Sequence, residues 1–200
     1  MIDYFRHKYK GFFNTIDIIK RKIKIFFGGY YFVMAKWRGV TFLGSCRFIG
    51  RPKFKLYPNT KIIIGNKCEF LSGHTDNLIG INHPCIISAF NAGTEIRIGE
   101  NSGFSGTIVA AFAGISIGNN VKCGANTLIT DSDWHPEDPR SGKPDPIDIG
   151  DNVWLGVNSV VLKGVKIGVN TVIGANSVVT KNIPANVVAV GNPCKVVKQI

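Results

Sequence analysis

The sequence has no long hydrophobic run. Near the N-terminus, the longest stretch without a charged residue covers only eleven positions, residues 25–35, and it contains two glycines. A bilayer-spanning helix needs about 20 apolar residues. A small-residue cleavage site of the secretory type does not follow this stretch, so a cleaved signal peptide is not expected. We therefore expect a cytoplasmic protein, either free or peripheral at the inner face of the cell membrane.

Cysteines are few and widely spaced. The chain has five of them, an odd number, and none forms a C-x-x-C pair. The cysteines are Cys46, Cys68, Cys85, Cys123 and Cys194. A disulfide framework or a thiolate zinc site is therefore not expected, and we predict buried, reduced thiols and no bound metal.

Acidic residues are also scarce. The chain of 200 residues has 24 Lys and Arg against 13 Asp and Glu, which gives a net charge of +11. With 44% hydrophobic and 18% charged residues, the composition is that of one globular domain. Residues 1–40 alone carry a net charge of +7, which leaves +4 for the remaining 160. No recognised nucleic-acid-binding motif accompanies this charge, so nucleic acid is not an expected partner.

Residues 1–40 are predicted to form a basic amphipathic arm. Its apolar residues recur every three or four positions, the period of one helix face. They are Phe12, Ile16, Ile19, Ile23 and Phe26. Such a helix can lie in an anionic membrane surface. It can also pack its apolar stripe against the open end of the adjoining domain, as terminal caps do in repeat proteins.

A six-residue period organises the rest of the chain. Six branched aliphatic residues follow one another in unbroken steps of six: Ile149, Leu155, Val161, Ile167, Ile173 and Val179. Glycine often follows the aliphatic residue, and asparagine recurs at turn-like positions, where the backbone needs a positive φ. Short strands that each bury one aliphatic residue and then turn can stack into a continuous column. The period therefore predicts an all-β parallel β-helix over residues 41–200.

Four segments carry a more specific signal: SGTIVAA at residues 105–111, DSDWHP at 131–136, IDIGDNVWLG at 147–156 and VVAVGNPCKVV at 187–197. With these motifs, residues 95–200 resemble the hexapeptide-repeat acyltransferases, in particular the galactoside and maltose O-acetyltransferases and related transferases of polysaccharide biosynthesis. The resemblance implies a left-handed β-helix, a homotrimer and acetyl-CoA as co-substrate. It also implies transfer of the acetyl group to a sugar hydroxyl, in surface polysaccharide or lipopolysaccharide biosynthesis.

The period breaks between Ile129 and Ile149, which predicts an inserted loop at residues 130–148. His135 lies in this polar segment, with Asp131 and Asp133 before it. A histidine near a carboxylate can be held in one tautomer and can accept a proton. The resemblance places the catalytic histidine in this loop, so we assign His135 as the general base. Asp133 is the first candidate for the residue that orients His135, and Asp131 is the alternative.

The resemblance also implies the residues that bind the substrates. The predicted CoA contacts are Ala175, Thr180, Lys181, Lys195 and Lys198, whereas Val157 replaces a serine that contacts CoA in the galactoside enzyme. The galactoside enzyme's Asn and Asp are absent from residues 103–111, so its sugar contacts do not transfer. Ser105, Thr107 and His83 are the candidates for binding the acceptor, which can be a lipid-linked sugar.

Two alternatives remain open at this point, and a third is disfavoured. The first is N-acetylation of an amino sugar, which also needs a base. The second is a non-catalytic β-helix that docks on membranes through its basic arm. The third, a zinc-dependent carbonic anhydrase on the same fold, needs three converging histidines. His74, His83 and His135 show no suitable spacing for such a site.

Overall fold

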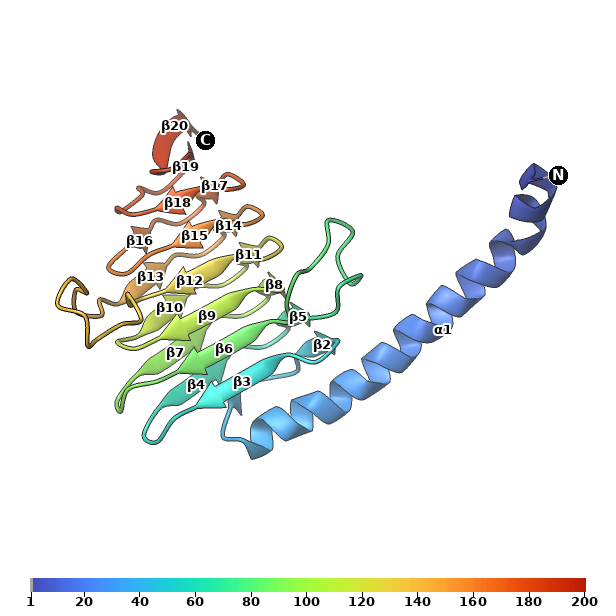
Figure 1. The fold of residues 1–200 in the computed structure, drawn as a ribbon, viewed down its shortest axis with the longest axis horizontal. Coiled ribbons are helices and arrows are strands. Elements are labelled where there is room, and N and C mark those ends of the chain that lie inside the picture. Colours follow the sequence, from blue (N-terminus) through green and yellow to red (C-terminus); the bar gives the residue numbers. More distant parts are fainter. Residues whose placement is uncertain (1) are drawn as a thin grey trace.

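The computed structural model describes residues 2–200, but not the side chains of residues 2–17, Lys20 and Arg21. Within the described range, the chain forms one helix followed by twenty strands in three sheets (Figure 1). The helix is α1 (Ile2–Trp37). The first sheet contains β1 (Thr41–Phe42), β4 (Lys61–Ile64), β7 (Glu95–Ile98), β10 (Ile115–Ile117), β13 (Ile147–Ile149) and β16 (Lys166–Ile167). The second contains β2 (Arg47–Ile49), β5 (Glu69–Leu71), β8 (Gly103–Ser105), β11 (Lys122–Cys123), β14 (Trp154–Leu155), β17 (Val172–Ile173), β19 (Val187–Val190) and β20 (Lys195–Gln199). The third contains β3 (Lys53–Leu56), β6 (Ile86–Ala89), β9 (Ile108–Ala111), β12 (Leu128–Thr130), β15 (Val160–Val161) and β18 (Val178–Val179).

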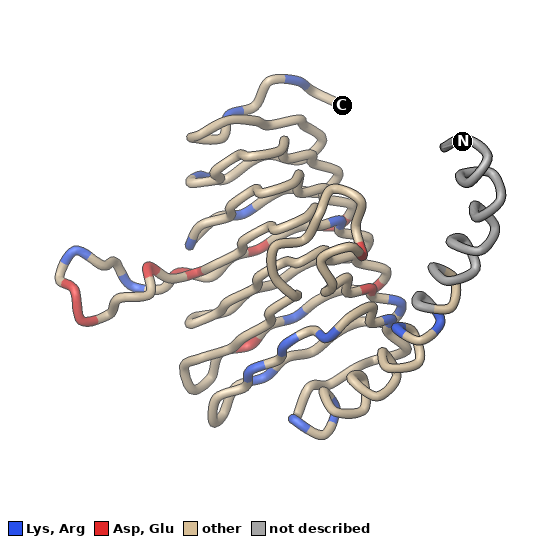
Figure 2. Tube along the Cα trace, turned by 45° about the vertical axis from the view of Figure 1, so that its right-hand side comes forward, with Lys and Arg blue, Asp and Glu red and all other residues tan. Residues whose placement is uncertain are grey.

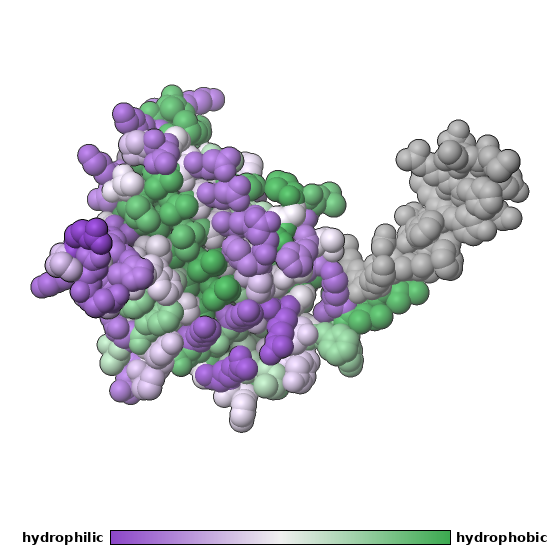
Figure 3. Space-filling model, in the orientation of Figure 1, coloured by the Kyte–Doolittle hydropathy of each residue, from purple (hydrophilic) through white to green (hydrophobic). Residues whose placement is uncertain are grey.

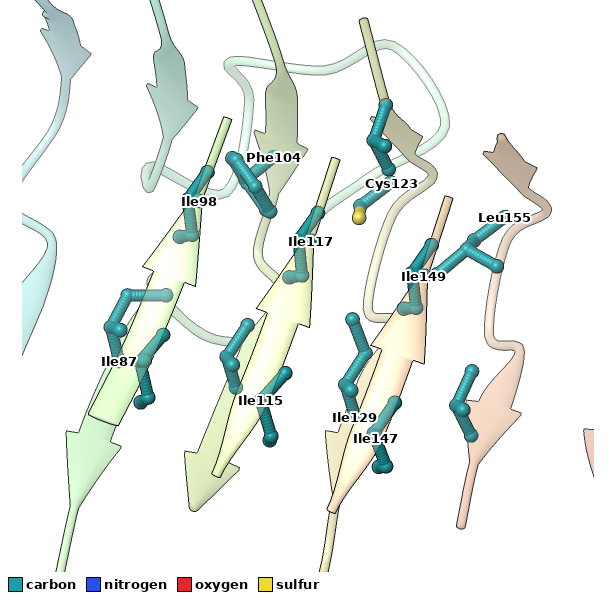
Figure 4. Close-up of a cluster of buried hydrophobic side chains, with 14 of the residues drawn as sticks. Ile87, Ile98, Phe104, Ile115, Ile117, Cys123, Ile129, Ile147, Ile149 and Leu155 are labelled. Carbon is teal, nitrogen blue, oxygen red and sulfur yellow. The ribbon is translucent and has the colours of Figure 1, made fainter. Parts of the chain in front are cut away.

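The strands wind through the three sheets in turn and form a parallel β-helix, as the six-residue period predicts. The β-helix is left-handed, as the family resemblance implies. Each strand pairs in parallel with its equivalent in the next coil, and only β19 and β20 pair antiparallel. The aliphatic residues of the six-residue period stack in register, for example Ile98, Ile117 and Ile149. These side chains point into the prism and are almost fully buried (Figure 4). The repeat therefore builds the core directly.

The chain turns at three corners, which we name by the sheets they join: the 1–2, 2–3 and 3–1 corners. The 1–2 corner carries a ladder of asparagines in which each side-chain amide donates to the amide oxygen of the next coil. Its members are Asn101, Asn120, Asn152, Asn170 and Asn186, all with φ between 55° and 59°. Glycine precedes the turn because the coils nearly touch there. A Cβ on Gly99 would lie 2.6 Å from the carbonyl carbon of Gly118.

The base of the β-helix is filled by aromatic rings. Phe48 lies 5.3 Å, centroid to centroid, from Phe70, and Phe70 stacks on Phe104 at 4.9 Å. Helix α1 covers this base with Phe32, whose ring is 5.9 Å from that of Phe48, and with the buried Ala35. Gly28 allows α1 to pack closely against β2, because a Cβ there would collide with the Phe48 carbonyl oxygen.

Helix α1 covers the base of the β-helix, but with residues other than the apolar stripe from Phe12 to Phe26 that the sequence suggested for this role. Ile19, Ile23 and Phe26 of the predicted stripe are exposed, whereas Phe12 and Ile16 lie outside the described side chains. The interpretation that this stripe packs on the β-helix is therefore wrong for its described part. No helix within the described residues combines the length and apolar content that a membrane span requires.

Two long loops leave the prism at different corners. One joins β5 to β6 and covers residues 72–85 at the 2–3 corner; the other joins β12 to β13 and covers residues 131–146 at the 3–1 corner (Figure 1). The second lies inside the predicted segment 130–148, whose ends belong to paired strands. It projects from the β-helix and carries charges of both signs (Figure 2). The first loop was not predicted, because the repeat is weak before Ile98.

Candidate active site

Asp131 fixes the start of loop 131–146. Its carboxylate is buried and accepts three backbone N–H bonds, from Phe112 at 2.7 Å, Ala113 at 2.8 Å and Gly114 at 2.7 Å. Burial raises the pKa of Asp131, and these three donors act in the opposite direction. Both oxygens of Asp131 are engaged by the backbone, and the carboxylate beside His135 is a different one. The role of Asp131 is to hold the turn between β9 and β10 against the loop.

Asp133 is occupied as well. It accepts a hydrogen bond from the Gly142 backbone N–H at 2.9 Å and forms an ion pair with Lys163. The Lys163 ammonium holds the pKa of Asp133 below its usual range. The predicted pairing of His135 with Asp133 is therefore not formed. Asp133 instead ties the middle of the loop to the next coil.

His135 pairs with Glu137, a residue that the sequence analysis missed. The Nδ1 atom of His135 lies 3.2 Å from Oε1 of Glu137, and the two side chains are 72% and 73% exposed. The backbone N–H of Glu137 and, after it, His135 hold the pKa of Glu137 below its usual range. A carboxylate at Nδ1 favours the tautomer with its proton there, which leaves Nε2 as the free acceptor. The only signal in the sequence was a carboxylate two residues further along the same loop.

An aromatic surface lies beside His135. Trp134 adopts a positive φ of 68°, and its ring meets those of Phe90 and Phe112 edge-on, each at 5.2 Å between centroids. Phe90 and Phe112 stack at 4.6 Å, and Tyr57 packs on Phe90 at 5.1 Å. The indole N–H of Trp134 donates to the Thr130 hydroxyl at 2.9 Å, which fixes the ring. The positive φ is costly for a bulky residue, and it directs Trp134 onto these rings.

A cavity of about 150 Å³ adjoins these groups, and its lining includes Asn91, Phe112, Trp134 and His135. The site thus combines a free imidazole nitrogen, a wall of aromatic faces and the polar side chain of Asn91. Chemically, this arrangement can remove a proton from a small polar group held against an apolar surface.

The candidate acceptor residues lie at the opposite edge of the third sheet, on the 2–3 corner. The Ser105 hydroxyl accepts a hydrogen bond from Asn77 at 3.2 Å, whereas the Thr107 hydroxyl is buried without a partner. His83 is half-buried in loop 72–85, with Nδ1 3.3 Å from the Pro84 carbonyl oxygen. One chain therefore does not bring these three residues to His135.

The predicted CoA contacts are all exposed and divide between the corners. Ala175 lies on the 2–3 corner after β17, and Thr180 and Lys181 lie on the 3–1 corner after β18, two coils above the loop that bears His135. Lys195 and Lys198 lie on β20, at the last edge of the second sheet. Among the described residues, no group of three or more His, Cys, Asp and Glu side chains is placed to hold a metal ion.

The third sheet connects the two corners and carries an apolar ladder on its outer face. Aligned residues of five successive coils contribute half-buried aliphatic side chains: Ile86, Ile108, Leu128, Val160 and Val178. Hydrophobic side chains form a band over this face (Figure 3). The equivalent positions of the first sheet are polar, with Arg97, Ser116 and Asp148. The outer face of the third sheet is therefore more apolar than that of the first.

Comparisons with known proteins agree with this architecture. A family model described as the hexapeptide repeat of succinyl-transferase matches residues 146–181. The galactoside O-acetyltransferase of Escherichia coli is 44% identical over 117 residues, which cover 56% of this chain and 57% of that enzyme. A Saccharomyces cerevisiae protein provisionally named an acetyltransferase is 41% identical over 138 residues, 66% of this chain and 68% of the yeast protein.

A solved structure, that of the polysialic acid O-acetyltransferase OatWY, superposes with a TM-score of 0.66 and 26% identity. The match covers 78% of this chain and 72% of that one. The chain spans only 56–60% of the length of the first three curated relatives it matches. The repeat, the fold and the yeast relative together show that this chain belongs to the hexapeptide-repeat acyltransferases.

Proposed function

We propose that the protein transfers an acetyl group from acetyl-CoA to a hydroxyl group of a saccharide, in the synthesis of a surface polysaccharide or lipopolysaccharide. The observation that carries this proposal is the His135–Glu137 pair beside the aromatic cavity. Nε2 of His135 removes the hydroxyl proton while the oxygen attacks the thioester carbonyl carbon. The C–S bond then breaks, and the CoA thiolate takes up a proton. General base catalysis of this kind contributes roughly 10² to 10⁴ in rate.

The aromatic surface supports a saccharide acceptor. Sugar rings present apolar C–H faces, which pack on aromatic rings, while their hydroxyls need polar partners at the edges. Trp134 and Phe112 supply the faces, and Asn91 supplies an amide within the same cavity. The polysialic acid O-acetyltransferase among the structural neighbours acts on a saccharide polymer by name, which supports the same acceptor class.

We propose further that the site is shared between subunits of a homotrimer. The apolar outer face of the third sheet suits burial against the same face of two other copies around a three-fold axis. In such a ring, the 3–1 corner of one subunit lies against the 2–3 corner of the next. His135 and Lys181 would then face Ala175 and Ser105 of the neighbouring subunit across one groove, which CoA would occupy.

An acetyl-CoA turnover screen across nucleotide sugars, lipid-linked sugars, simple glycosides and their amino-sugar counterparts tests the function. We expect turnover with hydroxyl acceptors that His135→Ala abolishes. Turnover with amino sugars alone would make the protein an N-acetyltransferase. Undetectable binding of acetyl-CoA would instead favour a non-catalytic β-helix.

Subunit complementation tests the shared site. Ala175→Trp should block the CoA groove from the 2–3 corner, and His135→Ala removes the base from the 3–1 corner. Co-refolded mixtures of these two inactive variants should regain activity, because one interface in a mixed trimer then retains both native residues. Mixtures that stay inactive, or a fully active monomer in sedimentation, would contradict a shared site.

A further inference from the structure

Helix α1 has two apolar faces: one packs on the base of the β-helix, and the other is exposed. Gly28, Phe32 and Ala35 face the base of the β-helix. At about 100° per residue, a second stripe with spacings of four and three lies on the opposite side of the helix. Its described members are Ile19, Ile23, Phe26, Tyr30, Val33 and Trp37. Each is at least half exposed, with Phe26 at 78% and Trp37 at 82%.

The positive charge of the protein is concentrated around this stripe. Residues 1–68 contain fifteen of the 24 basic residues and only two of the thirteen acidic ones, whereas residues 69–200 contain nine basic and eleven acidic. Lys22 is exposed beside the outward stripe. Lys36 and Arg38 are exposed on its two sides, each roughly 100° from its centre, and the Lys36 ammonium lies 4.9 Å from the centroid of the Phe32 ring. Lys53 and Lys55 are exposed on β3 in the first coil. The helix and the base of the β-helix therefore form one basic end, and the remainder of the β-helix is close to neutral.

We propose that α1 lies on an anionic lipid bilayer with this outward stripe in the headgroup region, and that the protein is thereby a peripheral membrane protein. A stripe of Ile, Phe, Tyr and Trp with cations along its sides is typical of helices that lie in the plane of a membrane surface. Aromatic residues favour the interface, and lysine and arginine reach from its edge to the lipid phosphates. The inward face of α1 stays packed on the β-helix, so membrane binding does not require the helix to detach from it.

The charge pattern argues against a second copy of the helix as the occupant. A stripe with spacings of three and four also suits a coiled coil, where the flanking positions stabilise pairing through opposite charges. Here the described charged residues that flank the stripe, Lys22, Lys36 and Arg38, are all basic. Identical helices would repel each other along those flanks, whereas an anionic bilayer would attract them.

Ion pairing fixes the direction in which the stripe points. Lys24, on the inward side of α1, forms an ion pair with Asp76 of loop 72–85, whose carboxyl group is only 3% exposed. Asp76 also accepts the Gly73 backbone N–H at 2.7 Å. The helix therefore cannot roll about its axis without leaving this buried carboxylate unpaired, which is costly. The outward stripe is a fixed feature of the surface.

Sedimentation of the full-length protein with vesicles tests the proposal. We expect binding to vesicles of phosphatidylcholine with phosphatidylglycerol, much weaker binding to phosphatidylcholine alone, and loss of binding as salt is raised. Replacing Lys22, Lys36 and Arg38 together by Gln should weaken binding by on the order of a hundredfold, because each cation contributes about fivefold. Failure of the wild-type protein to bind anionic vesicles at low salt would overturn the proposal.

A matched pair of variants tests the stripe itself. Phe26→Ser with Val33→Ser should reduce binding at least tenfold. Ile18→Ser with Ile25→Ser removes apolar residues that are also exposed but lie roughly 100° from the stripe, and should change binding much less. Equal losses in the two variants would contradict the assigned face. If the stripe variant instead lowers the oligomeric state without lipid, the face belongs to a second copy and the proposal is wrong.

Fluorescence quenching reports contact with the membrane in the wild-type protein, so it does not depend on a substitution that could destabilise the fold. Lipids brominated on the acyl chains should quench Trp37 on binding, whereas Trp134 and Trp154 lie in the 3–1 corner loop and on β14. Trp37→Phe should keep vesicle binding and lose most of the quenching. Quenching that persists in Trp37→Phe would place a different surface on the membrane and overturn the assigned orientation.

Discussion

Loops 72–85 and 131–146 interrupt the same β-helix at two edges of its third sheet, and each is held by a buried carboxylate. Asp76 binds Gly73 and Lys24 in the first, and Asp131 binds three backbone N–H groups in the second. Their histidines differ. Nδ1 of His74 lies 2.7 Å from the carbonyl oxygen of Ile81 in its own loop, whereas His135 is exposed and faces Glu137. In both loops the buried carboxylate is structural, and in loop 131–146 the imidazole of His135 lines a cavity.

The largest expected effect, on kcat, distinguishes the role of His135 from that of His74. His135→Ala should lower kcat by two or more orders of magnitude, because it removes the proposed general base, while the melting temperature and CoA affinity persist. His74→Ala should do the reverse: it removes a hydrogen bond within loop 72–85 and should lower the melting temperature with little change in kcat. Steady-state kinetics and thermal melts of both variants check this. Near-normal turnover by His135→Ala would remove the general-base assignment.

The second effect concerns Asp131, which anchors the loop that carries His135. Asp131→Ala leaves the N–H groups of Phe112, Ala113 and Gly114 without their acceptor. An unpaired N–H group costs about 1–3 kcal/mol when fully buried, and these three are partly buried, so we expect a clear fall in the free energy of unfolding, measured by denaturant titration. Activity should fall too, since the loop carrying His135 starts at this residue. A variant with wild-type stability would show that the three donors find other partners.

The upper coils could be predicted from the sequence, because each short strand there buries one aliphatic residue at a fixed step, as Leu155, Val161 and Ile167 do. The lower coils could not be predicted in the same way. There, Phe48 and Phe70 fill the core across several coils, and loop 72–85 shifts the phase. A search for the hexapeptide pattern detects a core built from one aliphatic side chain per strand, and it misses a core that is filled by phenylalanine rings.

The site was predicted in part. The break in the repeat singles out His135, but the carboxylate beside it in the structure is Glu137, and not Asp133 or Asp131, the two candidates from the sequence. Asp131, Asp133 and Glu137 are all within a few residues of His135, and only the folded loop shows which carboxylate is free. Asp131 is buried under the β9–β10 turn, and Asp133 meets Lys163, thirty residues further along. Contacts between coils of this kind leave no local trace in the sequence.

A smaller effect on kcat tests whether Glu137 orients His135. Glu137→Gln keeps the size of the side chain and removes its charge. Because both side chains are largely exposed, solvent screens the pair, and kcat should fall by roughly fivefold or less. Asp138→Asn is the matched control, since Asp138 lies in the same loop but pairs with Arg140. Equal kinetic effects of the two changes would show that general loop charge, not orientation of His135, is what matters.

The smallest effect concerns the ion pair that ties loop 131–146 to the next coil. Lys163 lowers the pKa of Asp133 from its ordinary value of 3.8. A carboxyl group whose pKa is lower in the folded state stabilises that state above its ordinary pKa, and this contribution is lost as the pH falls through the lowered value. The stability difference between the wild type and Asp133→Asn should therefore be constant near neutral pH and shrink below pH 3.8. Thermal melts across this range measure it, with Lys163→Met expected to show the same pH dependence. Because an amide oxygen also accepts the Gly142 backbone N–H, Asp133→Asn isolates the charge. A difference that persists unchanged in acid would mean that Asp133 does not act through its ion pair with Lys163.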